Sequence, residues 1–599
     1  MYLDYLNRPE DYYCIDIETD SLDAKVIWMM SWENIKTREK GRCIGHEEIT
    51  RWFLEAPTAI FVGHNALRFD IRIVNQLLGL RIPTRRLADT LILSMLYSPN
   101  LDGGHSLAAW AERIGMKKGD HNDFTHLSDE MIKYCDQDVN ITAELFRKIT
   151  KVLNKLGFSE KTCHIQHHFM SLLDRQTRNG FYFNIDGARS LYNLLQEKQA
   201  EIQESIDHVF PPVRNLVRTG RVHLKNGNCS AQYERDFSKY EIEYDDSLEW
   251  YSAYEAVPFN IGSPKQRVEK LLGLGWQPDT FTPKGHPKPT EEGLIAFADA
   301  TGIPEVALIT KYLSYNGRAN MINTWMESYN NETHAIHGKL FLADTLRLRH
   351  QSPNTANIPG VRQNKQGRLL LGDEGFYTYE SRDLWTARPG RCLVGTDASG
   401  LELRMLAHYI NREAFTRIVL DGDPHQYNAD LAGVDRPTAK TLLYAIQYGA
   451  QAKKVASIIK GTVEEGAELR QRFLDRLGLT GVMNDAISEQ KNGRVSLIDG
   501  ARVVCPSPHS ALNYKLQGGG ARVMAQGAIF LEEYIRRHGL DSLKVGDIHD
   551  EWEYDVDSKD AEEHRKLSVQ AIQDAGEELN LNISLTGKAK IGLTWAETH

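Results

Sequence analysis

The stretch GDIHDEWEY, residues 546–554, carries four acidic residues and a histidine. Carboxylate oxygens are preferred ligands of hard divalent cations, so His549, Asp550 and Glu551 are candidates for a metal-dependent site. The simpler interpretation is a charged hairpin that faces water, because acidic runs are common on protein surfaces. The metal interpretation requires a second carboxylate elsewhere in the chain.

A partner for Asp550 follows a predicted buried strand. In LVGTDASGLELRMLAH, this strand covers residues 393–396 and ends at Asp397, beside Ala398. Two aspartates that bridge two Mg²⁺ ions suit in-line phosphoryl transfer, in which positioning and charge neutralisation do most of the work. The alternative is that Asp397 caps a helix that begins at Leu401, a role that is compatible with metal binding.

Acidic residues near the N-terminus predict a second site. In YYCIDIETD, a strand would place Asp16 and Glu18 on one face. In MIKYCDQDVNIT, Tyr134 and Asp138 are four apart and share a helix face, and Asp70 lies between the two segments in sequence. We predict that the four acids converge on two cations that activate a water to attack a phosphodiester, with Tyr134 orienting that water. The alternative is a strand whose polar face is simply wet.

One predicted helix, DRPTAKTLLYAIQYG, carries cations and rings on the same face. Arg436, Lys440, Tyr444 and Tyr448 recur every four residues, after Asp435 as the predicted N-cap. The two cations can bind phosphates, and Tyr444 can stack on or beside a base. An ordinary amphipathic helix, with its cations in solvent and its rings in the core, explains the same pattern.

Length and composition predict a multidomain protein of the cell interior. The 599 residues exceed what one hydrophobic core organises. Seven scattered cysteines without a CxxC pair favour a reducing cytosol over a disulfide framework or a zinc ribbon. No apolar run is long enough to span a bilayer and no secretory signal opens the chain, so we expect a cytoplasmic protein without membrane contact. The net charge of −10 does not itself indicate a nucleic-acid binder, although RNLVRTGRVHLK is locally basic.

These candidate residues need alternating strands and helices to position them. We predict an α/β unit of about 150 residues, followed by a long helix that is broken at RNGFYFN. The unit comprises strand–turn–strand over 10–30, a strand and then helices over 60–95, and a helix over 128–155, and the broken helix covers 160–205.

The later part of the chain alternates in the same way. Residues 206–258 are predicted to be an insertion with little core of its own, after which Ser263 and Pro264 begin a new helix. A strand-rich region near 336–408, helices to about 535, the acidic hairpin and a closing helix complete the chain.

Three ordered motifs resemble those of the DNA polymerase I family, the family A DNA polymerases, and are most similar to the replicative enzymes of short-tailed phages. The motifs are DASGLELRMLAH, RPTAKTLLYAIQYG and IHDEWEY. Further matches are FNIGSPKQ (259–266), DTLRLRHQSPNTANIPGVR (344–362) and SPHSALNYKLQGGG (507–520). The N-terminal acids with Tyr134 resemble the proofreading exonuclease of this family. The ordered set covers nearly the whole chain and is far more specific than any one motif.

The resemblance implies an α/β multidomain fold, in which an RNase H-like 3′–5′ exonuclease domain precedes a right-hand polymerase of palm, fingers and thumb. It implies template-directed addition of deoxynucleotides to a primer 3′ end by two-metal nucleotidyl transfer, with proofreading, in the replication of a phage genome. The implied domains are the exonuclease (1–155), the thumb (156–335, with the insertion at about 206–258), the palm (336–409 and 516–599) and the fingers (410–515).

The resemblance also implies roles for single residues of the polymerase site. Asp397, Asp550 and the Ala398 carbonyl would bind two Mg²⁺ ions, with Mn²⁺ as a substitute, while Glu551 and His549 would flank the primer end. Two further groups contact the incoming nucleotide and the DNA. Arg436, Lys440 and His425 would hold the triphosphate, and Glu402 beside Tyr444 would exclude a ribose 2′-hydroxyl. The primer–template minor groove, whose acceptors are nearly independent of sequence, would be lined by Arg347, His509, Asn513 and Gln517.

The sequence departs from the family pattern in four ways. Ala445 stands where glycine is usual, which would stiffen the helix, and Tyr444 in place of phenylalanine predicts tolerance of dideoxynucleotides in a termination assay. The 5′-nuclease domain of bacterial relatives is not seen. In some phage relatives a longer thumb insertion recruits thioredoxin, but residues 206–258 look shorter and different, so that partner is not carried over. The insertion either clamps DNA, through Arg214, Arg218, Arg221 and Lys225, or binds a processivity factor or another replisome protein.

Three other functions fit less well. A nuclease with a degenerate polymerase half is disfavoured by the intact Asp397, Lys440, Tyr444 and Asp550. A DNA-binding scaffold would not need six well-placed carboxylates. A single-subunit RNA polymerase is disfavoured by Glu402 and by the N-terminal acids. The expected partners are therefore primer–template DNA and deoxynucleoside triphosphates.

Overall fold

The computed structural model describes residues 2–364 and 366–599, which form two compact units. The first unit contains the residues up to Tyr182 together with Asn330–Ile358 and Trp385–His599, and the second contains Phe183–Tyr329 and Pro359–Leu384. Within the described residues, no helix combines the length and the apolar character that a membrane span requires. All seven cysteines are free thiols.

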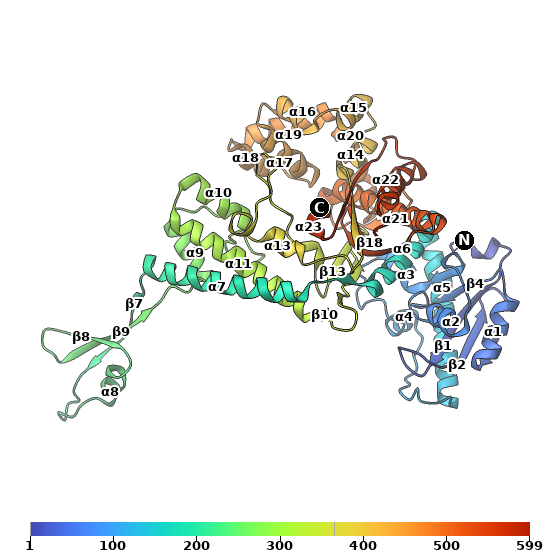
Figure 1. Cartoon of the computed structure of the whole chain (residues 1–599), viewed down its shortest axis with the longest axis horizontal. Coiled ribbons are helices and arrows are strands. Elements are labelled where there is room, and N and C mark those ends of the chain that lie inside the picture. Colours follow the sequence, from blue (N-terminus) through green and yellow to red (C-terminus); the bar gives the residue numbers. More distant parts are fainter. Residues whose placement is uncertain (1, 365) are drawn as a thin grey trace. The chain divides into compact units, whose positions relative to one another are not determined.

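A five-stranded sheet in the order β3-β2-β1-β4-β5 forms the N-terminal part of the first unit, drawn in blue in Figure 1. The central strand β1 (Tyr12–Thr19) pairs antiparallel with β2 (Ile27–Asn34) and parallel with β4 (Ile60–Gly63). Helix α5 (Asp129–Lys155) packs on β1 and β2, so β1 is covered and not wet. These elements confirm the predicted α/β unit. The others are β3 (Lys40–Ile44), α1 (Gly45–Glu55), α2 (Asp70–Leu78), β5 (Leu87–Asp89), α3 (Thr90–Tyr97), α4 (Leu107–Ile114) and α6 (Glu160–Asn179).

Helix α6 connects this sheet to the rest of the first unit. Near its start, the Glu160 carboxylate accepts hydrogen bonds from the backbone N–H groups of Tyr2 and Leu3, both at 2.7 Å. Further along, Gln166 accepts a hydrogen bond at 2.6 Å from Arg522, which is fully buried in a helix of the C-terminal half. The helix is thus fastened to both halves of the unit.

The break predicted after residue 160 falls at Gly180. Its φ of +63° is in the left-handed half of the map, and a side chain there would meet the His337 ring at 2.7 Å. The chain continues as β6 (Phe181–Tyr182) and α7 (Ile185–Val209), so α6 and α7 are separate helices, as RNGFYFN predicts.

A four-stranded sheet in the order β17-β18-β14-β19 carries the acidic hairpin. Strand β14 (Arg391–Ala398) is buried as predicted, and β17 (Ser542–Ile548) and β18 (Glu551–Asp557) form the predicted hairpin. The alternative of a hairpin that faces water is wrong, because both strands are mostly buried. Strand β19 (Gly587–Gly592) was not expected. The sequence GKAKIG has no apolar alternation, and its place at the sheet edge depends on pairing with β14. Helix α22 (Ala561–Glu578) is therefore not the closing element, because β19 and α23 (Trp595–Thr598) follow it.

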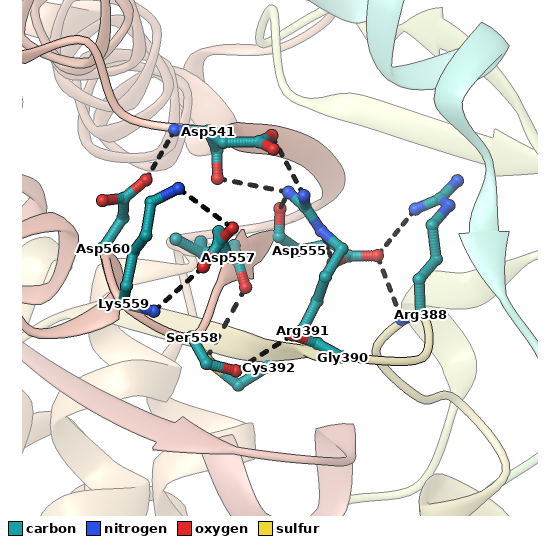
Figure 2. A network of polar contacts seen from close by, with 11 residues as sticks. Arg388, Gly390, Arg391, Cys392, Asp541, Asp555, Asp557, Ser558, Lys559 and Asp560 are labelled. Carbon is teal, nitrogen blue, oxygen red and sulfur yellow. Dashed lines mark hydrogen bonds and ion pairs between the residues drawn. The ribbon is translucent and has the colours of Figure 1, made fainter.

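A buried ion-pair network fixes β14 against β18 at the end of the sheet away from Asp397 (Figure 2). The Asp555 side chain is 1% exposed and accepts from Arg388 Nη1 at 2.7 Å and from Arg391 Nε at 2.6 Å. Because the side-chain period of a strand is two, a slip of one residue would turn every side chain to the other face. The network thus helps to set the register of the strand that ends at Asp397.

Helices dominate between β14 and β17, as predicted. Helix α14 (Leu401–Ile410) begins after Gly400, whose φ is +59°, and no side chain caps it. The alternative role of Asp397 as the cap of this helix is therefore wrong. The other elements are α15 (Glu413–Asp421), α16 (Pro424–Ala432), α17 (Arg436–Gln447), α18 (Ala452–Ile459), α19 (Val463–Leu477), α20 (Leu479–Gln490), β15 (Arg494–Ser496), β16 (Arg502–Val504) and α21 (Ala511–His538).

The second unit contains the insertion, whose strands and helix are drawn in green in Figure 1. Its sheet has the order β7-β9-β8, and Val222, Tyr251 and Ala253 form a small buried cluster with α8 against it. The expectation of little core therefore understated its structure. The insertion comprises β7 (Val213–Arg221), α8 (Ala231–Phe237), β8 (Glu241–Tyr244) and β9 (Trp250–Val257).

The predicted helix at Ser263 and Pro264 is present as α9 (Pro264–Gly273), with the Ser263 hydroxyl accepting from the Gln266 amide. The region 336–408, predicted to be strand-rich, also contains two short helices. The remaining elements are α10 (Glu291–Thr301), α11 (Pro304–Glu327), β10 (Tyr329–Asn330), β11 (Ala335–Ile336), β12 (Lys339–Leu342), β13 (Leu348–Gln351), α12 (Gly372–Gly375) and α13 (Thr378–Asp383).

Candidate active sites

The four N-terminal acids lie around one cavity of about 460 Å³. Asp16 and Glu18 lie on β1, Asp70 begins α2, and Tyr134 and Asp138 lie on α5. The backbone N–H of the residue between the first two acids donates to Asp70 Oδ1 at 3.1 Å. The structure thus brings together the five residues that the sequence proposed for this site.

The carboxyl groups of this cluster resist ionisation. Burial, followed by repulsion from Asp138 and Asp70, raises the pKa of Glu18 to about 8. Burial raises the pKa of Asp70 to about 7, although backbone hydrogen bonds act in the opposite direction. Asp16 has a raised pKa from burial first and then from its acidic neighbours. Such a cluster is stabilised as carboxylates only by added positive charge.

The donor set fits hard divalent cations. Asp138 is 5% exposed, and within the described part of the chain its Oδ1 is buried without a hydrogen-bond partner, as an unfilled metal ligand would be. Ligand atoms of Asp16, Glu18 and Cys135 lie within 4.8 Å of one another. The two carboxylates of this set suit Mg²⁺ or Mn²⁺, whereas the Cys135 thiol is a soft donor that these ions do not prefer.

Sequence reasoning missed two residues of this site. Cys135 places its thiol 3.3 Å from the Asp16 carbonyl oxygen, and its position next to Tyr134 was the available signal. Lys118 ion-pairs with Asp138 and donates to the Tyr134 hydroxyl at 2.9 Å. It lies outside any helix or strand, so no periodicity marks it.

The second set of acids meets at the end of the β14–β18 pair. Asp397 is opposite Glu551 in the antiparallel register, and the Ala398 amide donates to the Asp550 carbonyl oxygen at 2.9 Å. Burial, followed by repulsion from Asp550 and Glu551, raises the pKa of Asp397 to about 6. His549 adopts φ +56°, an uncommon conformation outside glycine, in the turn that presents Asp550.

Glu551 is held from behind by residues near the C-terminal end of the chain. Trp595 Nε1 donates to its Oε1 at 2.6 Å, and His599 Nδ1 lies 2.7 Å from its Oε2. Glu551 itself is 6% exposed. Because Trp595 and His599 belong to no motif, the sequence offered no signal for them.

Helix α17 arranges its predicted face as a ligand surface. Asp435 caps it by accepting from the Thr438 amide at 2.7 Å, as predicted. Arg436 and Lys440 are exposed, while Tyr448 is 48% exposed. The core side of the helix is formed by other residues, so the alternative in which both rings enter the core is wrong for Tyr448. The buried apolar residues of α17 are Ala439, Leu442, Leu443 and Ile446.

The other nucleotide candidates surround this face. The His425 ring, on α16, lies 6.1 Å from the Tyr444 ring, and Arg436 bonds to Asp423 at 2.7 Å. Burial, then repulsion by Lys440 and Arg436, lowers the pKa of His425, which shows that the cations lie close to it.

Glu402 bonds to Tyr448, which carried no predicted role. Tyr448 OH lies 3.3 Å from Glu402 Oε2, while Glu402 Oε1 is buried without a partner among the described residues. Burial, followed by the Glu402 charge, raises the pKa of Tyr444, so Tyr444 is also a neighbour. The expected pairing of Glu402 with Tyr444 therefore extends to a second ring.

The predicted DNA contacts lie around the same centre. Asn513 and Gln517 are one turn apart on α21, and a hydrogen bond from Gln517 lowers the pKa of Tyr448 against the effect of burial. The positive charge of Arg347 partly offsets the rise in the pKa of Glu402 and contributes to the lowering of the pKa of His549. Arg347 therefore lies near both residues. His509 follows on a short 3₁₀ turn, Pro508–Ser510, whose backbone approaches Gly449 so closely that a side chain there would meet the His509 carbonyl oxygen at 2.5 Å.

Comparison with known families decides the identity of this arrangement. A family model described as DNA polymerase family A matches residues 231–597, and one described as 3′-5′ exonuclease matches residues 11–154. The chain belongs to DNA polymerase family A. It is a DNA-directed DNA polymerase with an N-terminal 3′–5′ exonuclease domain, and the fold class predicted from the motifs is confirmed.

This family A polymerase is similar to phage enzymes along most of its length. It is 28% identical to the DNA-directed DNA polymerase of Escherichia phage T7, over 91% of this chain and 94% of the relative. It is 27% identical to that of Enterobacteria phage T3, over 90% and 92%. Its fold is similar to the POL domain of Pol1 from M. smegmatis in complex with DNA primer-template and dNTP, with a TM-score of 0.72 over 99% of this chain and 97% of that chain at 17% identity.

Proposed function

We propose that this polymerase extends a primer 3′ end at Asp397 and Asp550 and removes mispaired ends at the N-terminal acid cluster. The observation that carries the proposal is the register that places Asp397 opposite Glu551, with Asp550 bonded to the next backbone amide. Residues far apart in sequence are thereby neighbours, and the charge of Asp550 contributes to the raised pKa of Asp397, which supports a shared site for two-metal nucleotidyl transfer.

Asp397, Asp550 and the Ala398 carbonyl would hold two Mg²⁺ ions, for which Mn²⁺ could substitute. The bound ions neutralise phosphate charge and lower the pKa of the attacking hydroxyl. The raised pKa of Asp397 supports this assignment, because adjacent carboxylates in a buried place favour a shared cation.

The residues of α16 and α17 would bind the triphosphate. Arg436 and Lys440 offer donors to phosphate oxygens, and His425 would add a third. In the protein alone, Arg436 pairs with Asp423 on the surface, so nucleotide binding would exchange one anion for another. Water screens exposed pairs of this kind, which makes the exchange easy.

Selection of deoxyribose would depend on Glu402. Tyr448 fixes its carboxylate, and Tyr444 stands beside it, so a 2′-hydroxyl would meet occupied space. Arg347, Asn513, Gln517 and His509 would contact the minor groove of the primer–template, and His549 and Glu551 would flank the primer terminus. These contacts read acceptors that are nearly independent of base sequence.

The exonuclease site would use Asp16, Glu18, Asp70 and Asp138 to hold two cations of the same kind. Their oxygens face one cavity, which has room for a terminal nucleotide. Tyr134 at its wall would orient the water that attacks the last phosphodiester. The product is a nucleoside monophosphate, and the shortened strand leaves with a free 3′-hydroxyl.

Primer extension and single-strand degradation by the purified protein test the two-site assignment. Asp397→Ala should abolish extension with deoxynucleotides and Mg²⁺ while degradation continues. Asp16→Ala should abolish degradation while extension continues. Loss of both activities in either variant would contradict separate sites.

The insertion is better suited to a protein partner than to DNA. Residues 206–258 contain six Lys and Arg against nine Asp and Glu, so the net charge is negative. Arg214 is bonded to Glu241 at 2.9 Å, and Arg221 lies over the Trp250 ring at 5.0 Å. Arg214 and Arg221 are thus engaged within the insertion, and the surplus of carboxylates in this segment would repel phosphates.

Apolar exposure points to the same conclusion. Val213, Leu216 and Val217 are 51%, 55% and 41% exposed on β7, one of the two outer strands of the insertion sheet. An outer strand with apolar side chains can pair with a strand of another protein. We infer that the partner is a processivity factor or another replisome protein.

A triple change of Arg214, Arg218 and Arg221 to Ala separates these possibilities. We expect the Kd for primer–template DNA to change less than about twofold, because few released counterions depend on these side chains. A rise of tenfold or more would instead assign the insertion to DNA binding.

We also propose that the setting is replication of a phage genome in the host cytoplasm, since the T3 and T7 relatives match over most of both chains.

A further inference from the structure

Lys118 lies where no motif of the exonuclease site places a residue. It belongs to the segment 116–127, which joins α4 to α5 without a helix or strand. The segment is nevertheless fixed. Trp28 Nε1 donates to the Phe124 carbonyl at 3.0 Å, and the Gln137 side chain on α5 donates to the Lys117 carbonyl.

The Lys118 ammonium contacts two groups of the site at once. Its Nζ ion-pairs with Asp138 Oδ2, donates to Tyr134 OH at 2.9 Å, and lies 4.4 Å from the centre of the Tyr134 ring. The side chain is 21% exposed, so these contacts are partly shielded from water.

We propose that Lys118 is a positioning residue of the exonuclease reaction, which sets both the rotamer of Asp138 and the hydrogen-bond polarity of Tyr134. The inference rests on the proposed function of the N-terminal acids and adds to it a residue outside the motifs.

The polarity follows from the chemistry of the ammonium. A lysine ammonium has three donors and no acceptor, so the phenolic oxygen of Tyr134 must accept from it. The phenolic hydrogen takes no part in the contact with Lys118. In the protein alone it is shared with the Asp138 carboxylate, and a water or a phosphate oxygen in the cavity can accept it once a cation occupies that carboxylate. Lys118 therefore makes Tyr134 a donor toward the substrate.

The orientation of Asp138 follows from its two oxygens. Lys118 holds Oδ2, while Oδ1 is buried without a hydrogen-bond partner in the described residues and belongs to a cavity-lining side chain. Fixing one oxygen leaves the other to a cation. Groups that orient metal ligands in this way typically change activity 10–100-fold when removed.

A purely electrostatic role is the competing explanation, since a cation near four acids would offset their repulsion in any geometry. The two explanations predict different responses of the rate to added metal ion. Removing a neutralising cation should strengthen metal binding, and saturating Mn²⁺ should then restore the rate. Removing a positioning residue should lower the rate even at saturating Mn²⁺.

The test compares Lys118→Met with the unchanged protein in degradation of a single-stranded oligonucleotide at saturating Mn²⁺. We expect kcat to fall about 10–100-fold with little change in KM. Lys118→Arg, which keeps charge and donors, should recover most of the loss. Lys117→Met, at the exposed neighbouring position, should match the unchanged protein.

A double-mutant cycle with Tyr134→Phe supplies the decisive readout. If Lys118 acts partly through the Tyr134 hydroxyl, the combined loss should be at least about threefold smaller than the product of the single losses. Multiplicative losses, or full recovery of Lys118→Met by saturating Mn²⁺, would overturn the inference.

Primer extension by the same variants controls for folding, and it should be unchanged in each. If Lys118→Met degrades DNA normally while Asp16→Ala does not, only the role of Lys118 is wrong. If Asp16→Ala also degrades DNA normally, the proposed exonuclease site itself is wrong.

Discussion

The hydrogen bond between Tyr448 and Glu402 makes a prediction at the scale of one residue. Tyr448→Phe removes a bond to a charged group, worth about 1.5–3 kcal/mol. Glu402 would then move more freely, and we expect discrimination against ribonucleotides to fall about tenfold, measured as the ratio of kcat/KM for dCTP and CTP.

Tyr534→Phe is the matched control for that measurement. It removes another tyrosine–carboxylate hydrogen bond, which joins α21 to Asp574 on α22, and neither residue belongs to the proposed nucleotide site. It should leave the ratio unchanged. Equal ratios for Tyr448→Phe and the unchanged protein would contradict a role for Tyr448 in sugar selection.

Motif residues could be predicted individually, but their supports could not. Asp16, Asp397 and Asp550 stand in short patterns whose chemistry is readable. Lys118 and His599 act through contacts with residues far away in sequence, and neither lies in a periodic or spaced pattern. Such contacts exist only after folding, so a single sequence carries no local sign of them.

At the scale of elements, the β14–β18 pair depends on the buried Asp555. Asp555→Ala leaves Arg388 and Arg391 without their shared anion, and we expect a loss of about 3–5 kcal/mol in the free energy of unfolding. Urea unfolding would measure it. Asp557→Ala, which removes a carboxylate paired with the exposed Lys559, should cost far less, because water screens this pair. Equal losses would argue against the network as the support of the register.

Elements with local signals were predicted well. The caps at Ser263 and Asp435 predict α9 and α17, and the apolar run before Asp397 predicts β14. Strand β19 and the core of the insertion were missed, because an edge strand and a three-residue cluster gain their stability from neighbours and not from their own pattern.

For the whole molecule, buried histidines predict loss of stability in acid. Burial lowers the pKa of His167 to about 4 and that of His564 to about 3, from an ordinary value of about 6.5. Below pH 6.5 the unfolded chain binds protons that the folded protein does not. The free energy of unfolding should therefore fall as pH drops from about 6.5 to 4, by roughly 3 kcal/mol for each group.

Thermal unfolding between pH 7.5 and pH 4.5 checks this expectation. His564→Leu, which replaces a buried ring without hydrogen-bond partners among the described residues, should flatten the acid side of the profile. Substitution of the exposed His286 by Gln should not. Parallel acid losses in all three proteins would show that other groups control the profile.

The fastening of α6 has a practical consequence for making an editing-free reagent from this enzyme. Cutting away the first 155 residues would remove the backbone amides that Glu160 holds and would strip apolar cover from a helix that also supports Arg522. A shortened enzyme of that kind should be prone to aggregate. A single change at Asp16 instead keeps the whole scaffold and should abolish only the exonuclease activity.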